Sequence, residues 1–114
     1  MIRIYRFVFL LLVLLISYAA VTPTEGGASV PYIDKLLHFS AFLVLTLFMD
    51  LSLKKPLMLC RSALIFLIFY AFLIELVQYF IPYRSAEVFD FVSDLLGILV
   101  YLYFAPKINI SSTL

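Results

Sequence analysis

Four long apolar runs constrain the fold of this chain more than any other feature. They cover about residues 4–21, 36–53, 63–81 and 88–105. Each is close to the ~20 residues that a helix needs to cross the hydrocarbon core of a bilayer. None alternates polar and apolar residues as the strands of a membrane barrel do. We therefore expect an all-α bundle of four transmembrane helices, forming a single domain over residues 1–114.

The composition points the same way. Of the 114 residues, 66% are apolar and only 13% are charged. A water-soluble domain of this size needs far more polar residues to cover its surface. The composition thus argues against a soluble enzyme, a nucleic-acid-binding protein and a disordered chain. Membrane lipids are the expected partners, and no nucleic acid is expected.

The basic residues predict the orientation of the bundle. If the chain crosses the membrane four times, six of the basic residues fall on the side that holds both chain ends and two fall on the other side. The six are Arg3, Arg6, Lys54, Lys55, Arg61 and Lys107, and the two are Lys35 and Arg84. The positive-inside rule then places both termini in the cytoplasm. An alternative is that the first run is a cleaved signal peptide ending near Ser17-Tyr18-Ala19.

Most of the remaining polar residues fall at the opposite, extracytoplasmic end. Within each predicted helix they recur at helical spacing and so share one face. The candidate ligand-binding residues are Asp34, Lys35, His38, Glu75, Gln78, Arg84, Asp90 and Asp94. Ionisable residues inside a membrane are costly to keep, which makes them candidates for function. We expect three polar stripes to face one another and form a pocket at this end.

Charge balance gives this end its chemistry. Its acids outnumber its bases by five to two, since Glu87 joins the carboxylates named above. Excess carboxylates must be protonated, or must face a bound cation or a basic ligand group. Arg84 is the natural counter-charge, because its planar fork can hold a carboxylate or a phosphate in two hydrogen bonds. A structural ion-pair network, a ligand site and a proton or ion relay all remain open.

His38 is the only histidine and follows Asp34 by one helical turn. It is a candidate general base, together with Glu75 and Asp90 as further candidate catalytic residues. Asp34, His38, Glu75 and Asp90 would also make a mixed oxygen and nitrogen ligand set. A lone histidine is weak evidence for zinc, so the sequence assigns no metal and no cofactor.

Two further residues carry local predictions. Gly97 continues the stripe of Asp90 and Asp94, and would let another helix approach closely beneath the pocket. Asp50 is four residues before Lys54, which predicts an ion pair at the cytoplasmic boundary.

The order and spacing of these residues resemble the VanZ-like family of small bacterial membrane proteins. The resemblance rests on Asp34-Lys35-x-x-His38, Glu75-x-x-Gln78, Arg84, Asp90 and Gly97 and covers about residues 30–105. One departure is Asp94, where many relatives have an asparagine. The resemblance implies a multi-pass protein of the bacterial cytoplasmic membrane. The family's namesake is associated with resistance to the glycopeptide teicoplanin.

Two functions follow as hypotheses. The first is a cell-envelope protein that binds a lipid headgroup, a cell-wall precursor or a glycopeptide at the pocket. The alternative is a membrane enzyme that modifies an envelope lipid, with His38 or Glu75 as general base and Arg84 stabilising negative charge.

Overall fold

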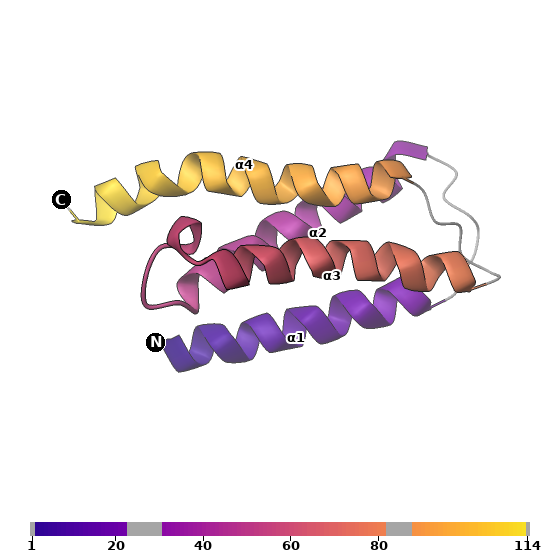
Figure 1. Cartoon of the computed structure of the whole chain (residues 1–114), viewed down its shortest axis with the longest axis horizontal. Helices are drawn as coiled ribbons and strands as arrows, with labels where there is room; N and C mark the ends of the chain where they lie inside the picture. The colour runs from indigo at the N-terminus through magenta and orange to yellow at the C-terminus, as the bar shows by residue number, and fades with distance from the viewer. Residues whose placement is uncertain (1, 23–30, 82–87, 114) are drawn as a thin grey trace.

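The computed structural model describes residues 2–22, 31–81 and 88–113, and only the backbone of 31–34 and 106–113. Four long helices make up almost all of this part (Figure 1). They are α1 (Ile2–Val21), α2 (Pro31–Leu51), α3 (Arg61–Phe80) and α4 (Val88–Thr113), with a short 3₁₀ turn, η1 (Leu57–Leu59), between α2 and α3. The all-helical fold expected from the apolar runs is confirmed.

The helix boundaries differ most from the expected spans at two places. The second helix begins five residues before the predicted residue 36, because the apolar run marks only its lipid-compatible part. The fourth continues past Ala105 through Pro106 to Thr113. Hydropathy therefore located the helices, but not the polar turns that extend them.

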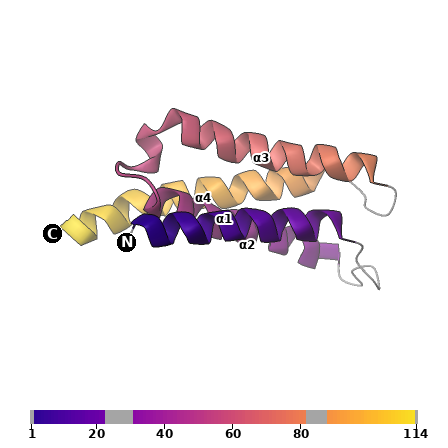
Figure 2. The same ribbon diagram turned by 90° about the horizontal axis from the view of Figure 1, so that it is seen from below.

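The four helices run side by side, each roughly antiparallel to the next in the sequence (Figures 1 and 2). The start of α1 and the end of α4 lie at the same end of the bundle. The most extensive helix–helix packing is between α2 and α4, and α1 packs against both α2 and α3. The core is apolar and includes Phe42, Leu45, Leu67 and Ile98.

The outer surface is apolar as well. Only Ala20 of α1 is buried, and large side chains such as Leu14, Phe69 and Leu99 are 66%, 59% and 59% exposed. Contiguous apolar surface of this extent is unfavourable in water and is expected where lipid covers it. Three helical segments of the described chain are long and apolar enough to cross a membrane: Ile2–Val21, Arg61–Phe80 and Val88–Ala105. The chain is therefore described as a helical membrane protein.

Hydrogen bonds hold the exposed first helix to its neighbours. The Tyr70 hydroxyl of α3 donates to the Val13 carbonyl at 2.9 Å and also contacts Ser17 Oγ at 2.6 Å. One end of α1 is held by Arg6 Nε, which donates to the Ser52 carbonyl at 3.1 Å. Cleavage of the first run as a signal peptide would thus remove the Val13 carbonyl, which accepts a hydrogen bond from the buried Tyr70.

A glycine sets the closest approach of α2 and α4. A Cβ placed on Gly97 would lie 2.5 Å from the Phe39 carbonyl oxygen and 3.0 Å from the Leu43 nitrogen. Real side chains do not tolerate such contacts with backbone, so only glycine fits at this crossing. The predicted role of Gly97 is confirmed. Because Phe39 follows His38 directly, the same crossing positions His38 against α4.

Candidate functional site

Three helix ends bring the predicted polar residues to one end of the bundle. Lys35 and His38 lie near the start of α2, Glu75 and Gln78 near the end of α3, and Asp90 and Asp94 near the start of α4. The three helix ends that carry the predicted polar residues therefore lie together. The side chain of Asp34, and Arg84 and Glu87 entirely, lie outside the described residues. We call Lys35, His38, Glu75, Asp90 and Asp94 the acid–histidine cluster.

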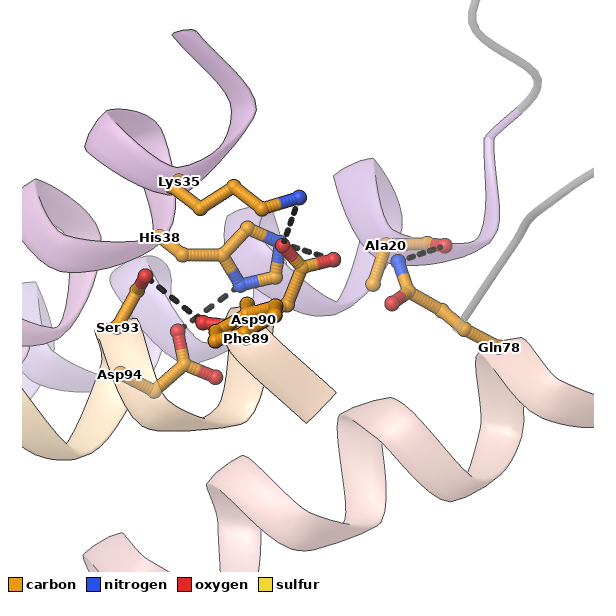
Figure 3. A network of polar contacts seen from close by, with 8 residues as sticks. All are labelled: Ala20, Lys35, His38, Gln78, Phe89, Asp90, Ser93 and Asp94. Carbon is orange, nitrogen blue, oxygen red and sulfur yellow. Dashed lines mark hydrogen bonds and ion pairs between the residues drawn. The ribbon is translucent and has the colours of Figure 1, made fainter. Parts of the chain in front are cut away.

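His38 lies between two carboxylates of α4 (Figure 3). Its Nδ1 is 2.9 Å from Asp94 Oδ1, and its Nε2 is 3.8 Å from Asp90 Oδ2. The two acids are one helical turn apart, so they can address opposite nitrogens of one ring. Asp90 is 2% exposed and Asp94 is 0% exposed. The geometry fixes the orientation of the imidazole from both sides.

Lys35 forms the outer edge of the cluster. Its Nζ is 3.3 Å from Asp90 Oδ1, and its side chain is 25% exposed against 3% for that of Asp90. A lysine can reach outward from a buried partner in this way, because its long apolar stem packs while its amine stays accessible. Lys35 is thus the more exposed partner of its ion pair with Asp90.

The third helix contributes Glu75. One carboxylate oxygen of Glu75, one oxygen of Asp94 and one ring nitrogen of His38 all lie within 4.8 Å of one another. The sequence suggested a mixed ligand set of Asp34, His38, Glu75 and Asp90. In the structure Asp94 joins His38 and Glu75, while Asp90 approaches the other ring nitrogen of His38.

Gln78, expected to face the pocket, instead makes a hydrogen bond to α1. Its Nε2 donates to the Ala20 carbonyl at 3.1 Å and so holds the end of α1 (Figure 3). The residue is 1% exposed, and its Oε1 makes no hydrogen bond within the described part of the chain. Gln78 therefore combines a structural bond with an acceptor atom that remains available.

Asp50 makes contacts that its sequence position did not predict. Its carboxylate accepts hydrogen bonds from the Leu57 backbone N–H at 3.0 Å and from the Tyr101 hydroxyl at 2.6 Å. Both are tertiary contacts, so the predicted i,i+4 pair with Lys54 is wrong for the described residues. Spacing along one helix could not reveal Tyr101, which is 51 residues away in the sequence. We call Asp50, Leu57 and Tyr101 the Asp50 junction.

Ser93 lies close to the cluster, but its hydroxyl bonds to its own helix. Its Oγ donates to the Phe89 carbonyl of the same helix at 2.8 Å. A serine bonded to its own helix has no base to activate it as a nucleophile. This agrees with the lack of any nucleophile motif in the sequence.

Fold and site together define a helical membrane protein with charged residues buried at one end of its bundle. Comparison with family models gives the family. The VanZ/LLP1 model matches residues 3–109, and the chain belongs to this family. The expected resemblance is thereby confirmed over nearly the whole chain.

One curated relative was found in a eukaryote. An uncharacterized protein of the fission yeast Schizosaccharomyces pombe is 34% identical over 94 residues, which is 79% of this chain. The match covers 55% of the relative, so this chain spans about half of its length. No solved structure matches. Because a relative occurs in yeast, similarity to this family does not by itself imply a bacterial membrane.

Proposed function

We propose that this protein is a multi-pass membrane protein that binds a polar or charged headgroup at the acid–histidine cluster. The observation that carries the proposal is the burial of Asp90 and Asp94, with His38, inside an apolar bundle. Ionisable groups at membrane depth are expensive, and their retention favours a function. The ligand would be an envelope lipid, a lipid-linked cell-wall precursor or a glycopeptide such as teicoplanin.

The proposed topology has four crossings and cytoplasmic termini. Its support is that α2 lies alongside three apolar helices and that the start of α1 and the end of α4 share one end. The basic residues Arg3, Arg6, Lys54, Lys55 and Arg61 belong to that end. The cluster then faces the extracytoplasmic side, and in a bacterium the membrane would be the cytoplasmic membrane.

In this proposal, anionic groups of the ligand would meet Lys35 and Arg84, and cationic or hydroxyl groups would meet the carboxylates. Lys35 is suited to first contact because it is the more exposed partner of its ion pair with Asp90. Ligands would then be selected by how well their charges complement those of Asp90, Asp94 and His38.

Binding can be tested with four probes: phosphatidylglycerol, phosphatidylethanolamine, a lipid-linked cell-wall precursor and teicoplanin. Each is added to the purified chain in a non-ionic detergent, and retention is measured by native mass spectrometry. We expect one probe to be retained by the wild type and to be lost in Lys35→Ala and Arg84→Ala. The matched control is Lys54→Ala, an exposed lysine at the opposite end, which should bind normally. Equal binding by all four proteins, or retention of no probe, would contradict the proposal.

A membrane enzyme is the second candidate, favoured by the 2.9 Å contact between His38 Nδ1 and Asp94 Oδ1. A carboxylate in this position orients an imidazole for proton transfer, as a general base requires. Incubation with a total lipid extract should then yield a product that His38→Ala does not form. Asp50→Ala should still form it. Absence of turnover by the folded wild-type protein would leave binding as the function.

A further inference from the structure

The side chains of His38, Glu75 and Asp94 bring three potential metal-ligand atoms together. Each comes from a different helix, α2, α3 and α4, and their candidate ligand atoms lie within 4.8 Å of one another. Around one ion with bonds of about 2.1 Å, tetrahedral ligands lie about 3.4 Å apart. The remaining gap is at most about 1.4 Å, a distance that side-chain rotations can close.

The surroundings of His38 are those of a metal-binding histidine. A coordinating imidazole usually donates its second N–H to a carboxylate, which fixes the ring and raises its basicity. Here Nδ1 faces Asp94, and Nε2 faces Asp90 Oδ2 at 3.8 Å. Asp90 is in turn 3.3 Å from Lys35 Nζ. An ion on Nδ1 would therefore complete a chain from lysine to carboxylate to imidazole to metal.

Gln78 supplies an independent observation. Its N–H bond to the Ala20 carbonyl fixes which way the amide is turned, so Oε1 must point away from α1. Figure 3 shows this oxygen on the side of the amide that faces Asp90. Gln78 is 1% exposed, and Oε1 accepts no hydrogen bond within residues 2–22, 31–81 and 88–113. A buried acceptor held on the Asp90 side of the cluster is suited to bind a water molecule or another polar group.

We propose that His38, Glu75 and Asp94 bind one divalent transition-metal ion, with Asp90 as a positioning residue. The charge agrees, because the described residues of the cluster include three carboxylates, Glu75, Asp90 and Asp94, against one lysine and one histidine. A divalent cation would balance that excess inside the bundle. One imidazole and two carboxylates suit Zn²⁺ or Mn²⁺ better than soft metals. The metal site shares residues with the headgroup site proposed above, but metal binding does not require that a headgroup be present.

The lone histidine makes a direct test possible on the wild-type protein. The chain is produced without a histidine tag, labelled with ¹⁵N-histidine, and purified in a non-ionic detergent without added lipid. Mn²⁺ is titrated and followed by electron paramagnetic resonance. We expect one Mn²⁺ per chain and a ¹⁵N hyperfine coupling, which His38 alone can provide. The absence of stoichiometric binding, or of the ¹⁵N coupling, would overturn the proposal.

Substitutions then distinguish the proposed metal-ligating residues from residues that only lie near them. Glu75→Gln and Asp94→Asn should weaken Mn²⁺ binding at least a hundredfold, and Asp90→Asn about ten- to a hundredfold, as expected for a partner of a ligating histidine. The matched control is Asp50→Asn, a carboxylate of the same bundle at the Asp50 junction, which should bind Mn²⁺ like the wild type. Equal affinity in all four variants would overturn the assignment. Since lipid is absent, this result does not depend on whether a headgroup binds.

Discussion

The acids at the two ends of the bundle have different kinds of partners. At the Asp50 junction, the carboxylate accepts hydrogen bonds from an uncharged backbone N–H and an uncharged hydroxyl. At the acid–histidine cluster, Asp90 and Asp94 face Lys35 and His38, which can carry charge. An acid that neutral groups of its own fold satisfy has a structural role. A cluster that collects ionisable groups from three helices is suited to meeting a charged ligand.

Between the two ends, the facing residues of α2 and α4 are largely apolar. Phe42 and Leu45 of α2 and Ile98 of α4 lie between them along their helices, and all three are at most 2% exposed. Thr46, which is also buried, donates to the Phe42 carbonyl of its own helix. Protons and ions need a continuous polar path, and the described residues of these helices provide none here.

The largest expected effect comes from the crossing on which both regions depend. Gly97→Ala places a Cβ against the backbone of Phe39, so α2 and α4 must separate. Overpacking of this kind typically costs ~1–3 kcal/mol, and a clash with backbone lies at the upper end. We expect a clear drop in the thermal unfolding midpoint in detergent, together with weaker Mn²⁺ binding. Leu99→Ala, on the lipid-facing side of α4, is the control, and an equal midpoint for the two variants would refute the role of the crossing.

Asp50→Ala should have the next largest effect and should leave the cluster intact. The change leaves the Leu57 N–H and the Tyr101 hydroxyl without their acceptor. An unsatisfied buried donor costs ~1–3 kcal/mol. The unfolding midpoint should fall while Mn²⁺ affinity stays at the wild-type value. Tyr101→Phe removes one bond and should lower stability less, by ~1 kcal/mol. If Asp50→Ala abolished metal binding, the two ends would not be independent.

Glu75→Gln should have the smallest effect on stability and a large one on binding. The substitution keeps the shape of the side chain and removes one of the excess negative charges. Functional sites are often kept at the expense of stability, so the unfolding midpoint should be unchanged or slightly raised. The measurement is the same thermal scan, made without metal. A drop larger than that of Asp50→Ala would instead make Glu75 part of a structural ion pair.

Much of this comparison could be predicted from the sequence. Apolar runs located four helices, and helical spacing placed the polar residues of three of them at one end. Gly97 was identified from its position in the same stripe. These are local properties of one helix, or follow from the order of the helices in the chain.

The contacts that depend on helix rotation could not be predicted. Spacing puts Asp90 and Asp94 on one face, but it does not say which of them meets Nδ1 of His38. Tyr101 and Tyr70 looked like ordinary aromatic residues of a membrane helix, and their hydroxyl partners lie on other helices. Only packing determines those pairs. A tyrosine in the middle of a span was the one available signal, since its hydroxyl needs a partner there.

The attachment of α1 also bears on the order in which the chain can assemble. Val13 lies inside α1, so its carbonyl already accepts a bond within that helix before Tyr70 approaches. Ala20 lies in the last turn, where carbonyls lack helical partners, and Gln78 supplies the missing donor. During synthesis α1 emerges first and can stand in the bilayer as a complete apolar helix. The buried donors, the Tyr70 hydroxyl and the Gln78 amide, belong to α3. Because α3 is synthesised after α1, their acceptors on α1 are already in the membrane when α3 enters it.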